Sequence, residues 1–410
     1  MTTHLDPVAA AHRASARKPR LPFVVFVLAS GTFLMLTTEF VIAGILPDVA
    51  ADLRISLAQA GSLITWFAVG MVVGAPSMTA VTMRLPKRTA LIIAMAVFVA
   101  GHVVVAISAD FRVLVFARVL TAFAAGTFWA VSAIVATRAA GPGSGARAIG
   151  VVSAGGALAT VLGVPAGAFV AQLVGWRGTF WALAIAGALG VALIAAFVPH
   201  DGPGHGPVTV HDVLGGLRSG RLWLALLACL TTAGGVLAAY SYIAPTLIDQ
   251  AGIRPGLVPL VLTGFGVGSL IGTLLGGRYG DAHPGLVTIL TPAVTTVLLL
   301  GICLVTGAPW VMAGLVLALG LFGLSANGVL IHLVVQHAGK AAPFASALAV
   351  SAFNAGTAIV TPIAGASLAT PLGVHGPAAV GTGILALTLI PTIALAVLRR
   401  RARTRALRHA

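Results

Sequence analysis

Residues 21–46 read LPFVVFVLASGTFLMLTTEFVIAGIL, an apolar run whose single charged residue is Glu39. At about 1.5 Å of rise per residue, a helix of this length crosses the roughly 30 Å hydrocarbon core of a bilayer. The run is too long for the apolar core of a secretory signal, lacks a small-residue cleavage site, and follows a polar segment with several basic residues. It therefore predicts a first transmembrane helix.

The rest of the chain has the same apolar character. Of its 410 residues, 59% are hydrophobic and only 8% are charged, whereas soluble domains carry about 25% charged residues. So much apolar surface indicates that lipid is the solvent. Twelve segments are long enough to span it, which predicts an all-α protein with twelve transmembrane helices at roughly 22–46, 58–82, 89–109, 111–137, 148–173, 179–198, 222–247, 257–278, 286–307, 310–335, 343–370 and 377–398.

The distribution of charge predicts the orientation of these helices. With both termini in the cytoplasm, 19 of the 24 Lys and Arg residues fall in cytoplasmic segments, one falls inside a helix, and four fall in outer loops: Arg54, Arg112, Arg177 and Arg254. Basic residues favour cytoplasmic loops, so residues 1–21 and 399–410 are expected to be cytoplasmic tails. The C-terminal arginines are interpreted as a solvated tail, with anionic lipid binding as the alternative. Topology explains the net charge of +15, and nucleic acid binding is not expected.

A polar segment at residues 199–221 divides the chain into two halves, residues 22–198 and 222–398. Its histidines and aspartates match no metal-ligand spacing, so a cytoplasmic linker is expected. Two six-helix, pseudo-symmetric bundles are predicted, because parallel repeats of this kind form a transporter architecture. A single offset of 198 residues aligns identical residues of the two halves: Pro47 with Pro245, Phe67 with Phe265, Gly70 with Gly268, Gly74 with Gly272, Ser153 with Ser351, Gly167 with Gly365, and Gly175 with Gly373.

Three motifs carry a resemblance to a known family. They are TTEFVIAGILPD at residues 37–48, Arg118 followed by Gly126 in the fourth segment, and GVPAG at residues 163–167 followed by GWRGTFW at 175–181. These motifs resemble the major facilitator superfamily, and within it the twelve-helix drug–proton antiporters related to bacterial chloramphenicol-efflux proteins. The resemblance implies the major facilitator fold and conformational roles for Gly163, Pro165 and Gly167.

One family element is altered. The family's loop between the second and third helices resembles G-x-x-x-D followed by basic residues. Here Gly74, Arg84 and Arg88 keep their places, but Met78 occupies the acidic position. The resemblance therefore implies a conformational latch that lacks its acid in the first half. The sequence GGRYGD at residues 276–281, with Arg278 and Asp281, is similar to a better-preserved copy of this latch in the second half.

Glu39 is the only glutamate in the chain, and counting from the segment ends places it roughly 13 Å below the outer surface. A carboxylate at such depth costs about 2.5 kcal/mol or more, so such residues usually face a cavity and have a function. We interpret Glu39 as a proton carrier that also contacts substrate. The alternative is a protonated acid bonded to a carbonyl of a neighbouring helix.

Arg118 lies roughly 12 Å below the same surface. Because a guanidinium keeps its proton, it must find acceptors or water. Two interpretations remain open. Arg118 either sets the proton affinity of Glu39 as a coupling residue, or bonds carbonyls that the glycines of the fifth helix leave free.

A set of aromatic and polar residues is expected to line a substrate cavity, which for amphiphilic ligands has mostly apolar walls and a few polar groups. Each member has helix packing as its alternative role. His102 and His332 lack an evident partner at helical spacing and are interpreted as core or interfacial residues. Cys229 and Cys303 lie near opposite faces, and no disulfide, metal or cofactor is expected. The cavity set, besides Glu39, is Trp66, Phe123, Trp129, Tyr240, Asn327 and Asn354.

The sequence thus predicts a monomeric secondary transporter in the bacterial inner membrane that exports small amphiphiles in exchange for protons. Phenicol-type antibiotics as substrates are implied by the resemblance alone. One alternative is a proton-coupled transporter of sugars, nucleosides or amino acids, which the same fold permits. The other is a membrane-embedded enzyme or channel. An enzyme would need clustered acids, His or Cys at membrane depth, where the chain offers one acid, and a channel is usually built from rings of like groups in an oligomer.

The predicted orientation is testable by cysteine labelling. In a variant in which Cys229 and Cys303 are replaced by serine, single cysteines placed beside Asp48 and beside Lys340 should react with an impermeant thiol reagent from opposite faces of the membrane. The charge asymmetry is the reason for this expectation. Labelling of both positions from the same face would contradict the twelve-helix topology.

Overall fold

The structure, a computed structural model, describes residues 21–82, 85–141, 144–200, 219–338 and 342–409. These ranges consist of helices joined by short turns and contain no strand. Their helices and helical turns are, in chain order, α2 (Phe23–Leu53), α3 (Leu57–Thr82), α4 (Lys87–Ile107), α5 (Phe111–Ala140), α6 (Gly145–Leu158), η1 (Ala159–Gly163), α7 (Val164–Val174), α8 (Trp176–Phe197), α10 (Gly220–Tyr240), α11 (Ile243–Pro245), η2 (Thr246–Gln250), η3 (Pro255–Leu257), α12 (Val258–Ala282), α13 (Pro284–Leu304), α14 (Pro309–Gly323), α15 (Asn327–His337), α16 (Ala342–Ser367), η5 (Gly373–His375) and α17 (Gly376–His409).

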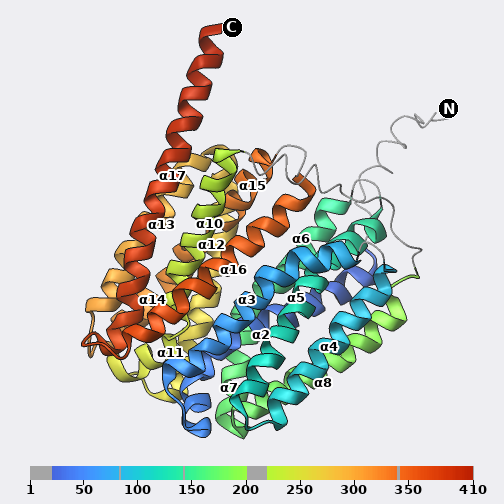
Figure 1. The fold of residues 1–410 in the computed structure, drawn as a ribbon, viewed down its shortest axis with the longest axis vertical. Helices are drawn as coiled ribbons and strands as arrows, with labels where there is room; N and C mark the ends of the chain where they lie inside the picture. Colours follow the sequence, from blue (N-terminus) through green and yellow to red (C-terminus); the bar gives the residue numbers. More distant parts are fainter. Residues whose placement is uncertain (1–20, 83–84, 142–143, 201–218, 339–341, 410) are drawn as a thin grey trace, which may run out of the picture.

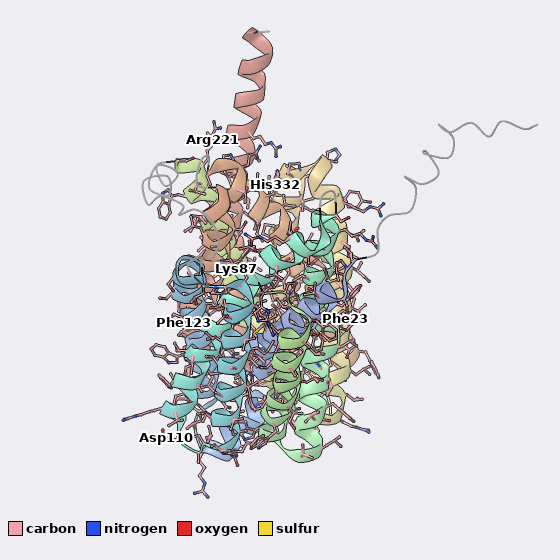
Figure 2. All side chains as sticks on the ribbon, turned by 90° about the vertical axis from the view of Figure 1, so that its right-hand side faces the viewer. Phe23, Lys87, Asp110, Phe123, Arg221 and His332 are labelled. Atoms are coloured by element: carbon pink, nitrogen blue, oxygen red, sulfur yellow. The ribbon has the colours of Figure 1, made fainter. Side chains whose placement is uncertain are left out.

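Twelve helical stretches in the described ranges are long and apolar enough to cross a bilayer, which confirms the predicted number. Figure 1 shows the helices of the first half, α2 to α8, on one side of the molecule and those of the second half, α10 to α17, on the other. The helices run between two ends. Figure 2 shows Asp110 at one of them and Arg221 and His332 near the other.

The first helix is longer than predicted. Its sequence suggested an end near Leu46, since proline disfavours a helix interior, but α2 continues through Pro47 to Leu53. Proline is tolerated inside transmembrane helices because neighbouring helices and local adjustments satisfy the freed backbone group. The helix ends at Arg54, whose backbone is left-handed and whose N–H donates to the carbonyls of Ala50 and Ala51.

Three predicted spans are interrupted helices. The fifth contains the wider, π-helical turn η1 directly before Pro165, and the seventh stops at Tyr240, five residues before Pro245. Because a proline ring clashes with the carbonyl four residues earlier, each break relieves a conflict that a straight helix would keep. The tenth span breaks between α14 and α15, at residues 324–326. The first two breaks lie where the two halves face each other, because η1 contacts α12 and α11 contacts α2.

The two bundles meet along α3 with α16 and along η1 and α7 with α12. At the second of these contacts, a Cβ on Gly266 would collide with the backbone carbonyl of Thr160, so the two helices touch backbone to backbone. Hydrogen bonds also cross between the bundles. The Ser351 hydroxyl donates to the Val72 carbonyl at 3.2 Å, and the Gln172 amide donates to the Pro255 carbonyl at 2.7 Å.

Inside the first bundle, η1 packs just as tightly on α2. A Cβ on Gly163 would overlap the hydroxyl of Thr37, which itself donates to the carbonyl of Phe33 at 2.8 Å. Adding atoms to a filled contact forces backbone shifts that cost roughly 1–3 kcal/mol. The glycine at this position is therefore required by the distance between the two helices.

Gly163→Ala should lower the thermal stability of the purified protein, with a loss of about 1–3 kcal/mol in the free energy of unfolding. Gly150→Ala is the matched control, since Gly150 lies in the adjoining helix α6 with open space at its Cβ position. Helix propensity alone should leave that control equal to the wild type or slightly more stable. Equal melting temperatures for the two variants would show that the α2–η1 contact is not tight.

Candidate functional site

Glu39 lies halfway along α2, with 16 residues before it and 14 after it in the helix. Its side chain faces a small cavity between the two bundles. The first bundle contributes residues of α2 and α3 to the cavity wall, and the second contributes residues of α10 and α16. The lining residues are Glu39, Phe40, Ala43, Ile64, Phe67, Ala68, Leu237, Tyr240, Ser241, Asn354 and Thr357.

This cavity is mostly apolar, with four polar groups besides Glu39: the hydroxyls of Tyr240, Ser241 and Thr357 and the amide of Asn354. The space left between the side chains holds at most about one water molecule. In this conformation the two bundles therefore leave no room beside Glu39 for a larger molecule. A drug-sized ligand would fit only after they separate.

Tyr240 is the largest polar residue of the cavity. Its ring packs against Phe265 with centroids 4.3 Å apart and meets Phe40 edge-on at 6.2 Å. Its hydroxyl is buried and has no hydrogen-bond partner in the described part of the chain. A buried hydroxyl without a partner costs free energy, so this group is available to a ligand that enters between the bundles.

Arg118 on α5 is 1% exposed, and its guanidinium bonds to α2 and α3. Nη1 donates to the backbone carbonyl of Thr38 at 3.0 Å and to the Thr38 hydroxyl at 3.1 Å, while Nε donates to the Leu63 carbonyl at 3.4 Å. The guanidinium also lies over the ring of Phe67, 4.3 Å from its centroid. The sequence led us to consider carbonyls of the fifth transmembrane span as acceptors for Arg118. In the structure the acceptors lie instead on α2 and α3, the first and second spans.

His102 on α4 completes this network. Its Nδ1 lies 2.6 Å from the carbonyl of Phe98, which can only accept, so Nδ1 carries a proton. Its Nε2 lies 2.7 Å from the Thr38 hydroxyl. That hydroxyl accepts from Arg118 and has one proton to give, so it donates to Nε2 of a neutral imidazole. The hydrogen bonds among Arg118, Thr38 and His102 therefore fit a single arrangement of donors and acceptors, with His102 neutral and protonated on Nδ1.

Glu39 and Arg118 are close in sequence-predicted depth but form no ion pair within 4 Å in the described residues. The Glu39 carboxyl has no hydrogen bond there, and Nη2 of Arg118 is buried without a partner. Arg118 thus bonds α2 and α3 in this structure, and its Nη2 forms no hydrogen bond in the described part of the chain. Nη2 of Arg118 and the carboxyl of Glu39 are therefore the two groups of this site that form no hydrogen bond in the described part of the chain.

The predicted substrate residues divide into two groups. Tyr240 and Asn354 line the cavity together with Glu39. The other four lie outside it: Trp66 on α3 is 44% exposed, Phe123 and Trp129 belong to α5, and Asn327 begins α15 with its Oδ1 buried and unpaired. The structure therefore brings together only part of the predicted set.

Several lining residues were missed by the sequence reasoning, although the repeat contains a signal for two of them. The offset of 198 residues carries Glu39 to Leu237 and Ala43 to Ser241, and all four line the cavity. Thr38, which binds both Arg118 and His102, stands directly before Glu39 in the first motif. Reading the motif and the repeat together would have identified these positions.

The conformational candidates lie at helix contacts. Gly74 of α3 packs on Phe123 of α5, and Gly167 of α7 packs on Val41 of α2. Arg88 of α4 donates to the Ala195 carbonyl and contacts His200, so it ties α4 to the end of α8. Pro165 is buried near the start of α7, and Arg278 is exposed on α12. Asp281 lies in α12 but its side chain, like that of Met78, is outside the description, and Arg84 lies outside the described residues.

Comparison with known proteins finds similarity to one family of membrane proteins along most of the chain. The Major Facilitator Superfamily profile matches residues 28–343. A chloramphenicol resistance protein of Streptomyces lividans is 33% identical over 362 residues, which cover 87% of this chain and 92% of that protein. The inner membrane transport protein YdhP of Escherichia coli K12 is 30% identical over 377 residues, covering 90% and 95%.

Solved structures show the same fold at low sequence identity. A bacterial homologue of the lysosomal transporter Spinster, in an inward-facing and unoccupied conformation, superposes with a TM-score of 0.70 at 14% identity and covers 93% of this chain and 96% of its own. The transporter FucP, in an outward conformation, gives a TM-score of 0.62 at 17% identity, covering 90% and 98%.

The hydroxyl of Thr38 should contribute more to stability than an ordinary buried hydroxyl. Thr38→Val leaves Nη1 of Arg118 with one acceptor fewer and Nε2 of His102 without a donor, which should cost about 1–3 kcal/mol. Thr32→Val is the control, because the buried Thr32 hydroxyl bonds only the Leu28 carbonyl of its own helix. Melting temperatures of the two purified variants provide the comparison. A Thr38→Val protein as stable as Thr32→Val would rule out the network as a stabilising element.

Proposed function

Because this chain belongs to the Major Facilitator Superfamily of membrane transporters, we propose that it exports small amphiphilic molecules, phenicol-type antibiotics among them, in exchange for protons. One observation carries the proposal. The only glutamate of the chain lines a cavity shared by both bundles, its carboxyl forms no hydrogen bond within the described residues, and the residue before it, Thr38, binds the buried Arg118.

The cavity wall supports a neutral or weakly charged amphiphile as substrate. Aromatic and aliphatic side chains form most of it, and hydroxyl and amide groups are placed at a few points. Such a wall matches a ligand with an apolar body and a few hydrogen-bonding groups. The chloramphenicol resistance protein among the relatives supports the same substrate class.

Proton exchange is supported by the two groups that lack a hydrogen bond in the described residues, the Glu39 carboxyl and Nη2 of Arg118. A carboxyl group in a closed apolar cavity is most stable when neutral, and one that meets water and a guanidinium is most stable when ionised. Opening of the cavity to one side and then to the other would therefore alternate between these two states. The unpaired Nη2 of Arg118 would donate a hydrogen bond to the charged carboxylate.

The membrane potential then drives export. We place the protein in the bacterial cell membrane with both termini in the cytoplasm, as the charge distribution predicts. An inward proton recovers about 2.3 kcal/mol per 100 mV, which sustains a gradient of tens-fold for a neutral substrate.

Glu39→Gln should abolish drug export against a gradient while the protein still folds and binds substrate, because glutamine keeps the shape of the side chain and removes its proton exchange. The measurement is proton-driven efflux of chloramphenicol from proteoliposomes, with binding to the purified variant measured separately. Glu39→Asp is the control, since it retains an ionisable carboxyl and should keep measurable efflux. Uphill efflux by Glu39→Gln would overturn the proton assignment.

The substrate assignment is tested separately by expression in a host that lacks its own pumps. Protection against phenicols by the wild type, but not by Glu39→Gln, is the expected result. Unchanged susceptibility to every drug of a broad panel, with the protein present in the membrane, would contradict the drug-export proposal and leave a metabolite as substrate.

A further inference from the structure

A second cavity lies entirely within the second bundle, among α10, α13, α15 and α17. Its volume is about 330 Å³, within the range of sites that hold small ligands. It lies at the end of the molecule where Figure 2 shows Arg221, opposite Asp110. No residue lines both this cavity and the one around Glu39, so the two are separate sites.

Two arginines from distant parts of the sequence converge on this cavity. Arg221 stands in the first turn of α10, and Arg399 stands late in α17. Among the described residues, no acidic side chain lines the cavity and neither guanidinium forms an ion pair. Two like charges held at one cavity create a positive potential that a bound anion would neutralise.

The other lining groups add hydrogen-bonding capacity and an apolar side. The imidazole of His337 donates through Nδ1 to the Leu333 carbonyl at 2.7 Å, which leaves Nε2 for a ligand. Gln336 contributes an amide, and Leu333 and Leu395 contribute apolar surface. An anion bound here would therefore lie beside hydrocarbon as well as beside charge.

We propose that this cavity binds the phosphate group of an anionic phospholipid from the cytoplasmic leaflet. Its position at the helix ends corresponds to the depth of the lipid headgroups, and its apolar side matches the start of the acyl chains. Basic pockets between transmembrane helices at the cytoplasmic side are sites of this kind. The inference concerns a lipid ligand and is independent of the proposed transport substrate.

Binding is tested on the full-length purified chain in a neutral detergent. The protein is titrated with dioctanoyl phosphatidylglycerol, dioctanoyl phosphatidylcholine or inorganic phosphate, and its melting temperature is recorded. Phosphatidylglycerol should raise the melting temperature with saturation, since a ligand that binds only the folded state stabilises it, whereas the other two should have little effect. An equal rise with inorganic phosphate, or with phosphatidylcholine, would overturn the assignment to an anionic lipid.

Charge-removal variants locate the site. Arg221→Gln with Arg399→Gln should weaken phosphatidylglycerol binding by about fivefold for each arginine removed. The control, Arg147→Gln with Arg278→Gln, removes the same charge from exposed positions that do not line the cavity, and it should keep the wild-type affinity. Equal losses in the two double variants would mean that lipid responds only to total charge, which contradicts a defined site.

A third variant tests the cavity itself while both arginines remain. Gly285 lines the cavity, and a Cβ there would only reach ordinary contact with Ala396 at 3.7 Å. Gly285→Leu should therefore fold, fill part of the space and weaken phosphatidylglycerol binding at unchanged charge. Wild-type affinity in a folded Gly285→Leu protein would show that the lipid does not enter the cavity.

Discussion

The central constraint on this protein is a guanidinium that cannot lose its proton and lies where water does not reach it. Arg118 lies in the first third of α5 and is buried, so the surrounding helices must supply acceptors. Thr38 of α2 and Leu63 of α3 do so, and His102 of α4 holds the Thr38 hydroxyl in place. Four helices of the first bundle are thereby fixed around one charge, and the position of Glu39 follows from that of its neighbour Thr38.

Close backbone contact is the second requirement of the architecture. Gly163 lets η1 lie against α2, and Gly266 lets α12 lie against the Thr160 backbone. Lipid tails are as apolar as the side chains, so helix association in membranes relies on such packing and on hydrogen bonds. The π-helical turn before Pro165 belongs to the same contact. Through this turn the fifth transmembrane span contacts α2 of its own bundle and α12 of the other bundle.

The fold was predictable because length and hydropathy determine which segments cross a bilayer, and a repeat offset pairs the halves. The depths of Glu39 and Arg118 followed from counting residues. The facing of side chains did not, because a helix that is apolar on all sides gives no periodic signal to separate lipid from protein. Trp66, predicted for the cavity, is for this reason found partly exposed, and the partnership of Thr38 with His102, 64 residues away, needed the fold.

The cavity wall is divided between the bundles in an unequal way. Glu39 and the whole arginine network belong to the first bundle, whereas Tyr240, Ser241, Asn354 and Thr357 belong to the second. Under the proposed function, the groups that exchange the proton and most of the polar groups that contact substrate therefore belong to different bundles. On that proposal, substitutions on α10 and α16 would change the range of molecules accepted while Glu39 and the arginine network stayed in place, so substrate range and proton exchange could evolve separately.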